Sequence, residues 1–284
     1  MFLKFIRDDK KIFTLGGSYK DTSSWGITKI SGTGTISNDI SKERFGDTDG
    51  EDVSGEYVPS RTIDITANVK SRSDNNSERQ RAISFFNPKH SFKLYVTRDG
   101  VTRWINVKIE KFQCADENFS KLQTAKWALL CPDPYFYSVD NYGKNIGAIA
   151  GGFHFPYINQ IGSAFIVGSY AFAKQVEIEN IGDVDTYAVV RIESTGTVAN
   201  PKIMNNGKYI RVIDVMEKGD CIEIDLLNNT IHKNGVNCIG KVDRSSSFTG
   251  MAVHPGDNTF SFSADSGETY MNVTLYYNLK YLGI

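Results

Sequence analysis

The sequence has few cysteines, few histidines, no excess charge of either sign and no long apolar run. Its 32 Lys and Arg balance 33 Asp and Glu, so the formal net charge is −1. A nucleic-acid binder normally carries a basic excess, and anionic membranes attract basic segments. We therefore expect neither sequence-specific nucleic acid nor a membrane as a partner. No window holds 18 consecutive apolar residues, so no membrane-spanning helix is expected.

The first ten residues lack the composition of a secretory signal. Lys4 interrupts their apolar content, and Arg7, Asp8 and Asp9 end it. A signal peptide needs a longer uncharged apolar core. We therefore expect the chain to be made and folded in a cytoplasm.

Metal and disulfide chemistry have little support. None of the four cysteines lies in a CxxC pair, so reduced and mostly buried thiols are expected rather than a disulfide scaffold. The four histidines form no HxxxH, HxH or HExxH motif. One half of the chain does hold four soft ligands, but their spacing matches no zinc motif: Cys221, His232, Cys238 and His254. We expect no metal and no cofactor.

Enzyme motifs are also missing. The sequence has no GxSxG and no Walker A signature, and Gly32-Thr33-Gly34 is followed by no helical pattern. The pairs Glu177/Glu179 and Glu223/Asp225 would lie about 6.6 Å apart on a strand, within the range of glycosidase carboxylates. The same spacing is typical of the solvated face of a strand. We expect no enzyme, and a cell-wall hydrolase using Glu223 and Asp225 stays as an alternative.

What the sequence does contain is a strand-and-turn pattern. Seventeen Phe, 14 Tyr and 25 Gly accompany many β-branched residues. Apolar and polar residues alternate over 61–70, which predicts a strand with one face against a core. The segments 92–96 and 105–109 alternate in the same way around Asp99-Gly100, a dipeptide that favours a hairpin turn.

One helix is expected, at 77–86. Ser77 and Gln80 fit a capping box at its start. Asn87-Pro88 ends it, because the residue before a proline avoids the α-helical region. Its apolar stripe has helical spacing and consists of Ala82, Phe85 and Phe86.

The second half returns to short strands. Pro132 and Pro134 cannot both sit in a central strand, so we expect one domain at 1–138 and another at 139–284. The stretch 143–168 has no period and is interpreted as a crossover or long loop. Beyond Lys174 the two-residue period returns, with hairpin signals at Asn206-Gly207 and Asn234-Gly235. This spacing is typical of a sandwich or jelly roll.

Several segments, in this order along the chain, resemble the distal tail protein family of tailed bacteriophages. The helix and its exit at 81–89, the preceding strand at 61–65 and the segment 131–136 resemble that family's first domain. The segments 219–225, 234–237, 254–258 and 281–284 resemble its second. The motif residues in these segments are expected to build the fold rather than bind a ligand: Arg61, Arg81, Phe85, Phe86, Asn87, Pro88, Pro132, Asp133, Pro134, Gly219, Asp220, Asn234, Gly235, Pro255, Gly256 and Asn258.

The resemblance implies a mainly β fold. The first domain would be a β-barrel or split sandwich with one helix, and the second a galectin-like sandwich. It also implies a homohexameric ring in the virion tail tip or baseplate that joins the tail tube to the tail-associated hub protein. The ring would support receptor-binding proteins and leave a central channel for DNA.

Two further expectations concern binding surfaces. The strand 61–70 has backbone groups that could pair across subunits. A galectin-like domain also raises the alternative of a carbohydrate-binding module that contacts the host cell wall. That alternative has little support, since all three Trp precede the second domain and Asn200-Pro201-Lys202 lacks the arginine of the galectin Asn-Pro-Arg.

Overall fold

The structure, a computed structural model, divides into two compact units. It describes residues 1–18, 21–44, 46, 49–114, 121–139, 142–145, 148–151, 168–171 and 175–284. Unit 1 comprises Met1–Val139 together with Lys280–Ile284, and unit 2 comprises Asp140–Leu279. The sequence prediction of a second domain at 139–284 therefore differs for the last five residues. No helix among the described residues is long and apolar enough to cross a membrane.

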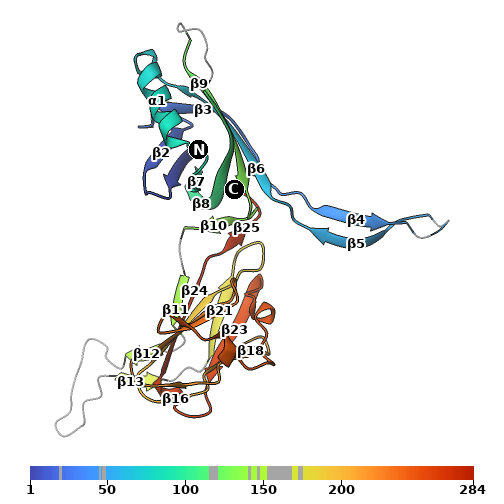
Figure 1. Ribbon diagram of the computed structural model, residues 1–284, viewed down its shortest axis with the longest axis vertical. Coiled ribbons are helices and arrows are strands. Elements are labelled where there is room, and N and C mark those ends of the chain that lie inside the picture. The colour runs from blue at the N-terminus through green and yellow to red at the C-terminus, as the bar shows by residue number, and fades with distance from the viewer. Residues whose placement is uncertain are drawn as a thin grey trace. The chain divides into compact units, whose positions relative to one another are not determined.

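Unit 1 is built around a closed sheet (Figure 1). The strand order is β25-β10-β8-β7-β1-β2-β3-β6-β9, and β9 also pairs with β8, which closes seven of these strands into a barrel. The strands are β1 (Phe2–Arg7), β2 (Ile12–Gly16), β3 (Trp25–Ser31), β6 (Arg61–Val69), β7 (Phe92–Arg98), β8 (Val101–Cys114), β9 (Thr124–Cys131), β10 (Phe136–Ser138) and β25 (Lys280–Tyr281). This confirms the expected barrel with one helix.

Strand β6 shows the predicted alternation of buried and exposed residues. The expectation that this strand pairs across subunits is wrong. Its residues Arg61–Asn68 pair with β9, and Asp64–Val69 pair with β3, so both edges are occupied over most of its length. Strand β6 therefore has few free backbone groups for a contact with another subunit.

Helix α1 (Asn75–Phe85) begins two residues before the predicted start, directly after the 3-10 turn η1 (Arg72–Asp74). The expected Ser77–Gln80 capping box is wrong, because Asp74 is the N-cap and the Ser77 hydroxyl donates to the Asp74 carbonyl at 3.0 Å. Asn75 instead fixes the start of the helix, since its side chain bonds the Lys121 carbonyl and the Gln123 N–H. The helix ends before Asn87-Pro88, and its apolar stripe is buried, as predicted.

Two strands of unit 1 form a hairpin of their own, which we call the arm. It comprises β4 (Asp39–Glu43) and β5 (Asp52–Tyr57), a two-stranded sheet in which every strand residue is exposed (Figure 1). A β-bulge between Ser41 and Lys42 interrupts the pairing. The sequence analysis did not predict this element.

Unit 2 is a sandwich of two main antiparallel sheets, which confirms the predicted fold class. Buried side chains from both sheets form its core, among them Ile192, Ile222, Ile203, Phe260 and Val273. One sheet has the order β11 (Tyr142–Asn145), β24 (Met271–Tyr277), β15 (Val189–Ser194), β20 (Cys221–Asp225), β21 (Thr230–Lys233) and β22 (Val236–Asn237). The other has β14 (Gln175–Asn180), β23 (Gly256–Ser263), β17 (Lys202–Asn205) and β18 (Lys208–Arg211).

Shorter elements complete unit 2. Two small sheets pair β12 (Ala148–Gly151) with β13 (Gly168–Ala171), and β16 (Val198–Ala199) with β19 (Val215–Met216). Three 3-10 turns lie at Ile239–Lys241, Thr249–Met251 and Glu268–Tyr270. The crossover predicted at 143–168 therefore includes strand residues, and its portions 146–147 and 152–167 lie outside the described residues.

The predicted hairpin dipeptides are confirmed. Asp99-Gly100 joins β7 to β8, Asn206-Gly207 joins β17 to β18, and Asn234-Gly235 joins β21 to β22. Each pair has positive φ at both residues, from 46° at Asn206 to 86° at Gly100. Asn, Asp and Gly adopt this left-handed region at low cost, which is why these dipeptides locate the turns.

Candidate functional site

The described residues hold no group of three or more His, Cys, Asp or Glu side chains placed to bind a metal ion. The candidate zinc ligands have other neighbours. The Cys238 thiol donates to the Ile231 carbonyl at 3.7 Å, and His254 Nδ1 lies 2.9 Å from Asp185 Oδ1. The residues of interest are therefore the motif residues and the surfaces that the fold exposes.

The carboxylate pair on β20 has a structural explanation. Asp225 Oδ1 accepts the backbone N–H groups of Leu227 and Asn228, each at 3.0 Å, and Oδ2 accepts the Asn228 side-chain amide at 2.7 Å. Asp225 thus holds the turn that follows β20. This geometry does not support a catalytic role for Asp225, on which the hydrolase alternative depends.

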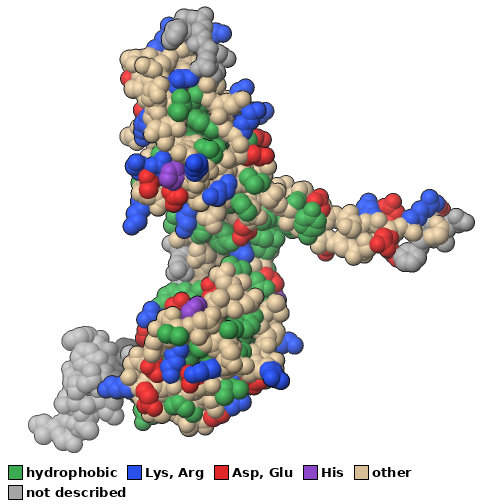
Figure 2. All heavy atoms as spheres, viewed as in Figure 1, with side chains coloured by type: hydrophobic (Ala, Val, Ile, Leu, Met, Phe, Trp, Pro, Cys, Tyr) green, Lys and Arg blue, Asp and Glu red, His purple; other side chains and the backbone are tan. Residues whose placement is uncertain are grey.

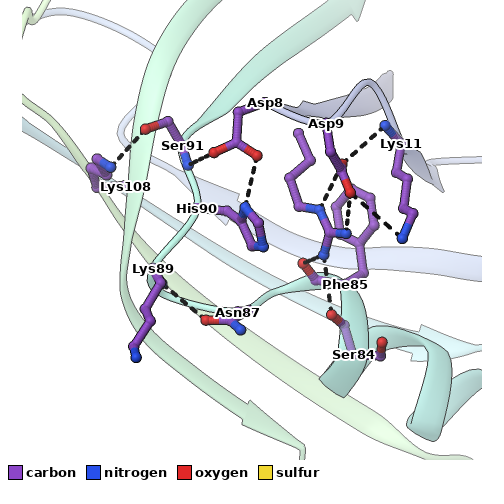
Figure 3. Close-up of polar contacts among 11 residues, drawn as sticks. Asp8, Asp9, Lys11, Ser84, Phe85, Asn87, Lys89, His90, Ser91 and Lys108 are labelled. Atoms are coloured by element: carbon purple, nitrogen blue, oxygen red, sulfur yellow. Dashed lines mark hydrogen bonds and ion pairs between the residues drawn. The ribbon is translucent and has the colours of Figure 1, made fainter.

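The buried side chain of Arg7 joins the end of α1 to the β1–β2 turn. Its partners Asp9, Ser84 and Phe85 are labelled in Figure 3. Arg7 is 7% exposed, and its Nη1 donates to the carbonyls of Ser84 and Phe85 at 3.2 and 3.1 Å. Its Nε and Nη2 donate to the Asp9 carboxylate at 2.8 and 2.5 Å. These bonds hold the pKa of Asp9 well below its usual range. Arg7 satisfies helix carbonyls that have no partner within the helix, and the sequence analysis missed it.

The motif residue Asn87, which directly precedes Pro88, lies in the same cluster (Figure 3). The Asn87 side chain accepts the Lys89 N–H at 3.0 Å, which shapes the turn after the helix. His90 Nδ1 lies 2.7 Å from Asp8 Oδ1, and Asp8 Oδ2 accepts the Ser91 N–H at 3.1 Å. The bond from Ser91 is the main cause that lowers the pKa of Asp8. These bonds give Asn87 and Asp8 a structural role in the turn that follows the helix.

Arg81 and Phe86 connect the helix to the aromatic core. The Arg81 guanidinium lies 4.9 Å from the centre of the Phe13 ring and bonds Glu78, which also accepts the Trp25 indole N–H at 2.9 Å. Phe86 is 2% exposed. Its ring centre lies within 6.0 Å of those of six other aromatic residues: Phe5, Phe13, Phe85, Phe92, Phe112 and Trp127.

The remaining motif residues of unit 1 lie beside β10. They are Arg61, Pro132, Asp133 and Pro134. Asp133, between Pro132 and Pro134, accepts the Tyr135 N–H at 3.2 Å and the Tyr137 hydroxyl. Burial, followed by this bond, raises the pKa of Tyr137. Arg61 is 6% exposed, its guanidinium lies 5.1 Å from the centre of the Phe136 ring, and burial lowers its pKa.

In unit 2, side-chain hydrogen bonds connect two turns. These turns contain the motif residues Gly219, Asp220, Asn234 and Gly235. Asp220 accepts the Glu217 N–H at 2.9 Å and the Asn234 amide at 2.8 Å, and Lys233 Nζ lies 3.0 Å from it. Asn234 Oδ1 in turn accepts the Cys221 N–H at 2.9 Å. The bond from Glu217 is the first of several that lower the pKa of Asp220 to about 2.

This shift predicts an acid-labile contact in unit 2. Because the folded pKa of Asp220 is depressed, its stabilisation is complete above about pH 4, the unfolded value, and is lost as the pH falls toward about 2. We expect Asp220→Asn to lower the melting temperature of unit 2 at pH 7. Between pH 4 and pH 2, the melting temperature of the variant should decrease less than that of the wild type. Calorimetry across that range measures both. A parallel acid profile for the wild type and Asp220→Asn would contradict the assignment.

Three buried asparagines hold the loop that contains Pro255 and Gly256. Asn258, which is 1% exposed, donates to the carbonyls of His254 and Gly256 at 2.7 and 2.9 Å and accepts the His254 N–H at 2.9 Å. Asn180 donates to the Val253 carbonyl at 2.9 Å, and Asn205 donates to the Ala252 carbonyl at 2.8 Å. Of the three, only Asn258 was expected, because Asn180 and Asn205 are the last residues of two strands and belong to no motif that the sequence analysis named.

The polar groups around Asn200 and Lys202 are engaged with one another. The Asn200 amide and Arg211 both bond Asp265, at 2.7 and 2.5 Å, and Lys202 Nζ lies 4.0 Å from the centre of the Tyr209 ring. The ring is thus covered by a cation on this side. The carbohydrate alternative has no specific support here.

Comparisons with known proteins agree with the motif order. A model of the phage tail protein RIFT-related domain matches residues 16–125, and a model of the siphovirus-type tail component C-terminal domain matches residues 181–281. The chain belongs to the phage distal tail protein family. No curated protein matched the chain.

Solved structures of distal tail and baseplate proteins share the fold. The crystal structure of SPP1 Dit, described as a paradigm of the hub adsorption apparatus in phages that infect Gram-positive hosts, has a TM-score of 0.70 at 13% identity over 98% of each chain. A chain of the phage P2 baseplate, in its activated conformation with Ca, has a TM-score of 0.55 at 12% identity over 100% of each chain. Together with the two family models, these structures support a structural tail-tip or baseplate role for this distal tail protein.

Proposed function

We propose that this distal tail protein assembles into a homohexameric adaptor ring. Unit 1 forms the ring, and unit 2 supports other tail-tip proteins. The ring joins the tail tube to the tail-associated hub protein, carries receptor-binding proteins and leaves a channel for DNA. Assembly takes place in the cytoplasm of the bacterial host. The exposed arm is the observation that chiefly supports self-assembly.

The arm has the features of an element that needs a partner. An isolated two-stranded hairpin is marginal in water, because it has no third strand or helix to cover one face. All residues of β4 and β5 are exposed, including Ile40 at 46% and Val53 at 61%. Neither strand pairs with a third strand among the described residues, and the arm carries charged side chains of both signs (Figure 2).

Unit 1 also offers a surface that complements the arm. A hollow of about 600 Å³ lies between the end of α1 and β8, lined in part by Ile83, Ile109 and Phe112. The arm, with its exposed Ile40 and Val53, and the hollow, which apolar side chains line in part, are two different surfaces on one chain. Such a pair makes a head-to-tail contact, which closes into a ring when the rotation between subunits permits. We therefore propose that the arm of one copy packs at the hollow of its neighbour.

The first test is the assembly state of the purified full-length protein. Light scattering is expected to give six times the chain mass of 31.7 kDa, which is about 190 kDa. Negative-stain electron microscopy of the same sample is expected to show six-fold rings with a central hole. If the protein stays monomeric even when mixed with its tube and hub proteins, the ring proposal is wrong.

Charged substitutions in the arm test where the contact lies. The double variant Ile40→Asp, Val53→Asp is expected to lower the mass from the ring to the single chain, because two carboxylates would be desolvated at the interface. Ile83→Asp, at the hollow, is expected to have the same effect. Ile181→Asp, which changes a 60% exposed residue of unit 2, is the control and should still form rings. Rings that persist in both test variants would contradict this interface.

A further inference from the structure

The last five residues of the sequence, Lys280–Ile284, form a segment that we call the strap. The chain reaches the strap from unit 2, yet the strap belongs to unit 1. It adds an antiparallel strand to the edge of the sheet, with Tyr281 opposite Phe136 and Lys280 opposite Tyr137. Lys280 is 8% exposed, and its Nζ lies 5.5 Å from the centre of the Tyr137 ring. The strap thus occupies a built site rather than an open surface.

Two arginines bind the backbone of the strap. Arg61 Nη2 donates to the carbonyl of Leu282, and Arg103 Nη1 donates to the carbonyl of Gly283. Arg103 also stacks on Tyr281, with its guanidinium carbon 3.5 Å from the ring centre. Both arginines come from the barrel, on β6 and β8. Charge-assisted bonds of this kind are stronger than bonds between neutral groups, so they favour an extended chain at this position.

The site also selects the strap by shape. The Ile284 N–H donates to the Thr33 carbonyl at 2.9 Å, and the side chains of Tyr281 and Ile284 pack against the core of unit 1. A Cβ atom added to Gly283 would lie 2.3 Å from the Gly34 carbonyl oxygen. Because that oxygen belongs to the backbone, no side-chain movement relieves the clash. An aromatic residue, a glycine two positions later and an aliphatic residue after it are therefore the recognised features.

The strap's contacts are those of a peptide that adds a strand to an exposed sheet edge, a common way for proteins to bind extended segments. Its only covalent link to unit 1 runs through all of unit 2. An identical strap from a second copy would make the same hydrogen bonds and ring contacts. Exchange of an identical element between copies adds no new interface and is a low-cost route to association.

We propose that the strap site of unit 1 is a peptide-binding site that takes the strap as a separable ligand, and that the strap of a second copy can fill it. The site recognises an extended segment with the sequence Lys-Tyr-Leu-Gly-Ile. This proposal does not rest on the hexameric ring, because it concerns an edge of the sheet that is distinct from the arm. It would link copies by exchange in addition to any ring contact.

The test begins with the intact, folded protein. A protease recognition sequence is inserted between Leu279 and Lys280, and the purified protein is then cleaved. The strap is expected to stay bound through gel filtration, and a labelled peptide with capped ends, Lys-Tyr-Leu-Gly-Ile, is expected to displace it in a saturable way. Fluorescence anisotropy measures the exchange. A strap that leaves at once without rebinding, or one that no peptide displaces, would overturn the proposal.

Matched variants test the recognition. A peptide with Gly283→Ala is expected to bind at least about tenfold more weakly, because of the clash with the Gly34 carbonyl. The Arg103→Ala protein is expected to lose a similar factor, since one charge-assisted bond is removed. A peptide with Leu282→Ala is the control and should bind nearly as well as the original, because Leu282 is 38% exposed and contributes its carbonyl. Equal binding of all three peptides would show adhesion without recognition.

Exchange between copies needs a separate measurement. A tagged chain that lacks residues 280–284 offers an empty site, and an untagged Arg103→Ala chain offers a strap that its own site holds weakly. When the two chains are mixed and the tagged chain is captured on an affinity resin, the untagged chain is expected to be retained with it. The control pair has no strap on either chain, so its retention reports ring contacts alone. Retention that is equal in the two mixtures would overturn exchange and leave the ring proposal untouched.

Discussion

Replacing Phe86 by alanine is expected to lower the free energy of unfolding of unit 1 by about 3–5 kcal/mol, the range found when a buried phenylalanine is truncated. Phe86 is 2% exposed and lies among six other aromatic rings from β1, β2, β7, β8, β9 and α1. Its removal leaves a cavity where these elements meet. Edge-to-face contacts with Phe5 and Trp127 are lost as well.

Urea unfolding followed by tryptophan fluorescence measures this effect selectively. All three tryptophans, Trp25, Trp104 and Trp127, lie in unit 1, so the signal reports that unit alone. Val101→Ala is the matched control, because Val101 lies in the same unit but is 50% exposed. It should cost less than about 1 kcal/mol. A loss below about 1 kcal/mol for Phe86→Ala would show that the aromatic cluster does not hold the helix to the barrel.

Local sequence signals predicted the parts of the fold that depend on local conformation. The Asn-Gly and Asp-Gly turns follow from the positive φ that these residues tolerate. The strand at 61–69 follows from its period of two, which requires only that one face be buried. The capping box at Ser77 was misplaced because a 3-10 turn and the anchoring of Asn75 by residues 121–123 move the start of the helix. Tertiary contacts decided between two plausible starts.

The contacts that the sequence analysis missed join residues far apart in the chain. Arg7 reaches the end of α1 across 77 and 78 positions, and Arg61 reaches Leu282 across 221. No period or turn motif marks such a pair. The arm was missed for a different reason, since its strands have no buried face and hence no alternation to detect. The boundary at 138 placed the strap in the wrong unit, and a chain that ends at Ser138 would leave the sheet edge beside Phe136 without it.

The second large effect is expected in unit 2, where Asn258→Ala removes the side chain that shapes the loop at 254–258. The Asn258 side chain is 1% exposed. Its Nδ2 donates to two backbone carbonyls of that loop, and its Oδ1 accepts one backbone N–H. Alanine leaves those backbone groups without these bonds in a buried position, which costs about 1–3 kcal/mol for each group that stays unsatisfied. We expect a total loss of about 3 kcal/mol in the free energy of unfolding of unit 2. The effect should spread to Ala252 and Val253, which Asn205 and Asn180 hold from neighbouring strands.

Unit 2 has no tryptophan, so two probes separate the units in one sample. Circular dichroism or calorimetry should show an earlier unfolding transition in Asn258→Ala, while the tryptophan transition of unit 1 stays where it is in the wild type. Asn272→Ala is the matched control, because Asn272 is an exposed residue of the regular strand β24. If both variants leave the unit 2 transition unchanged, the loop is held by its backbone alone. If the tryptophan transition moves together with that of unit 2, the two units unfold as one cooperative body.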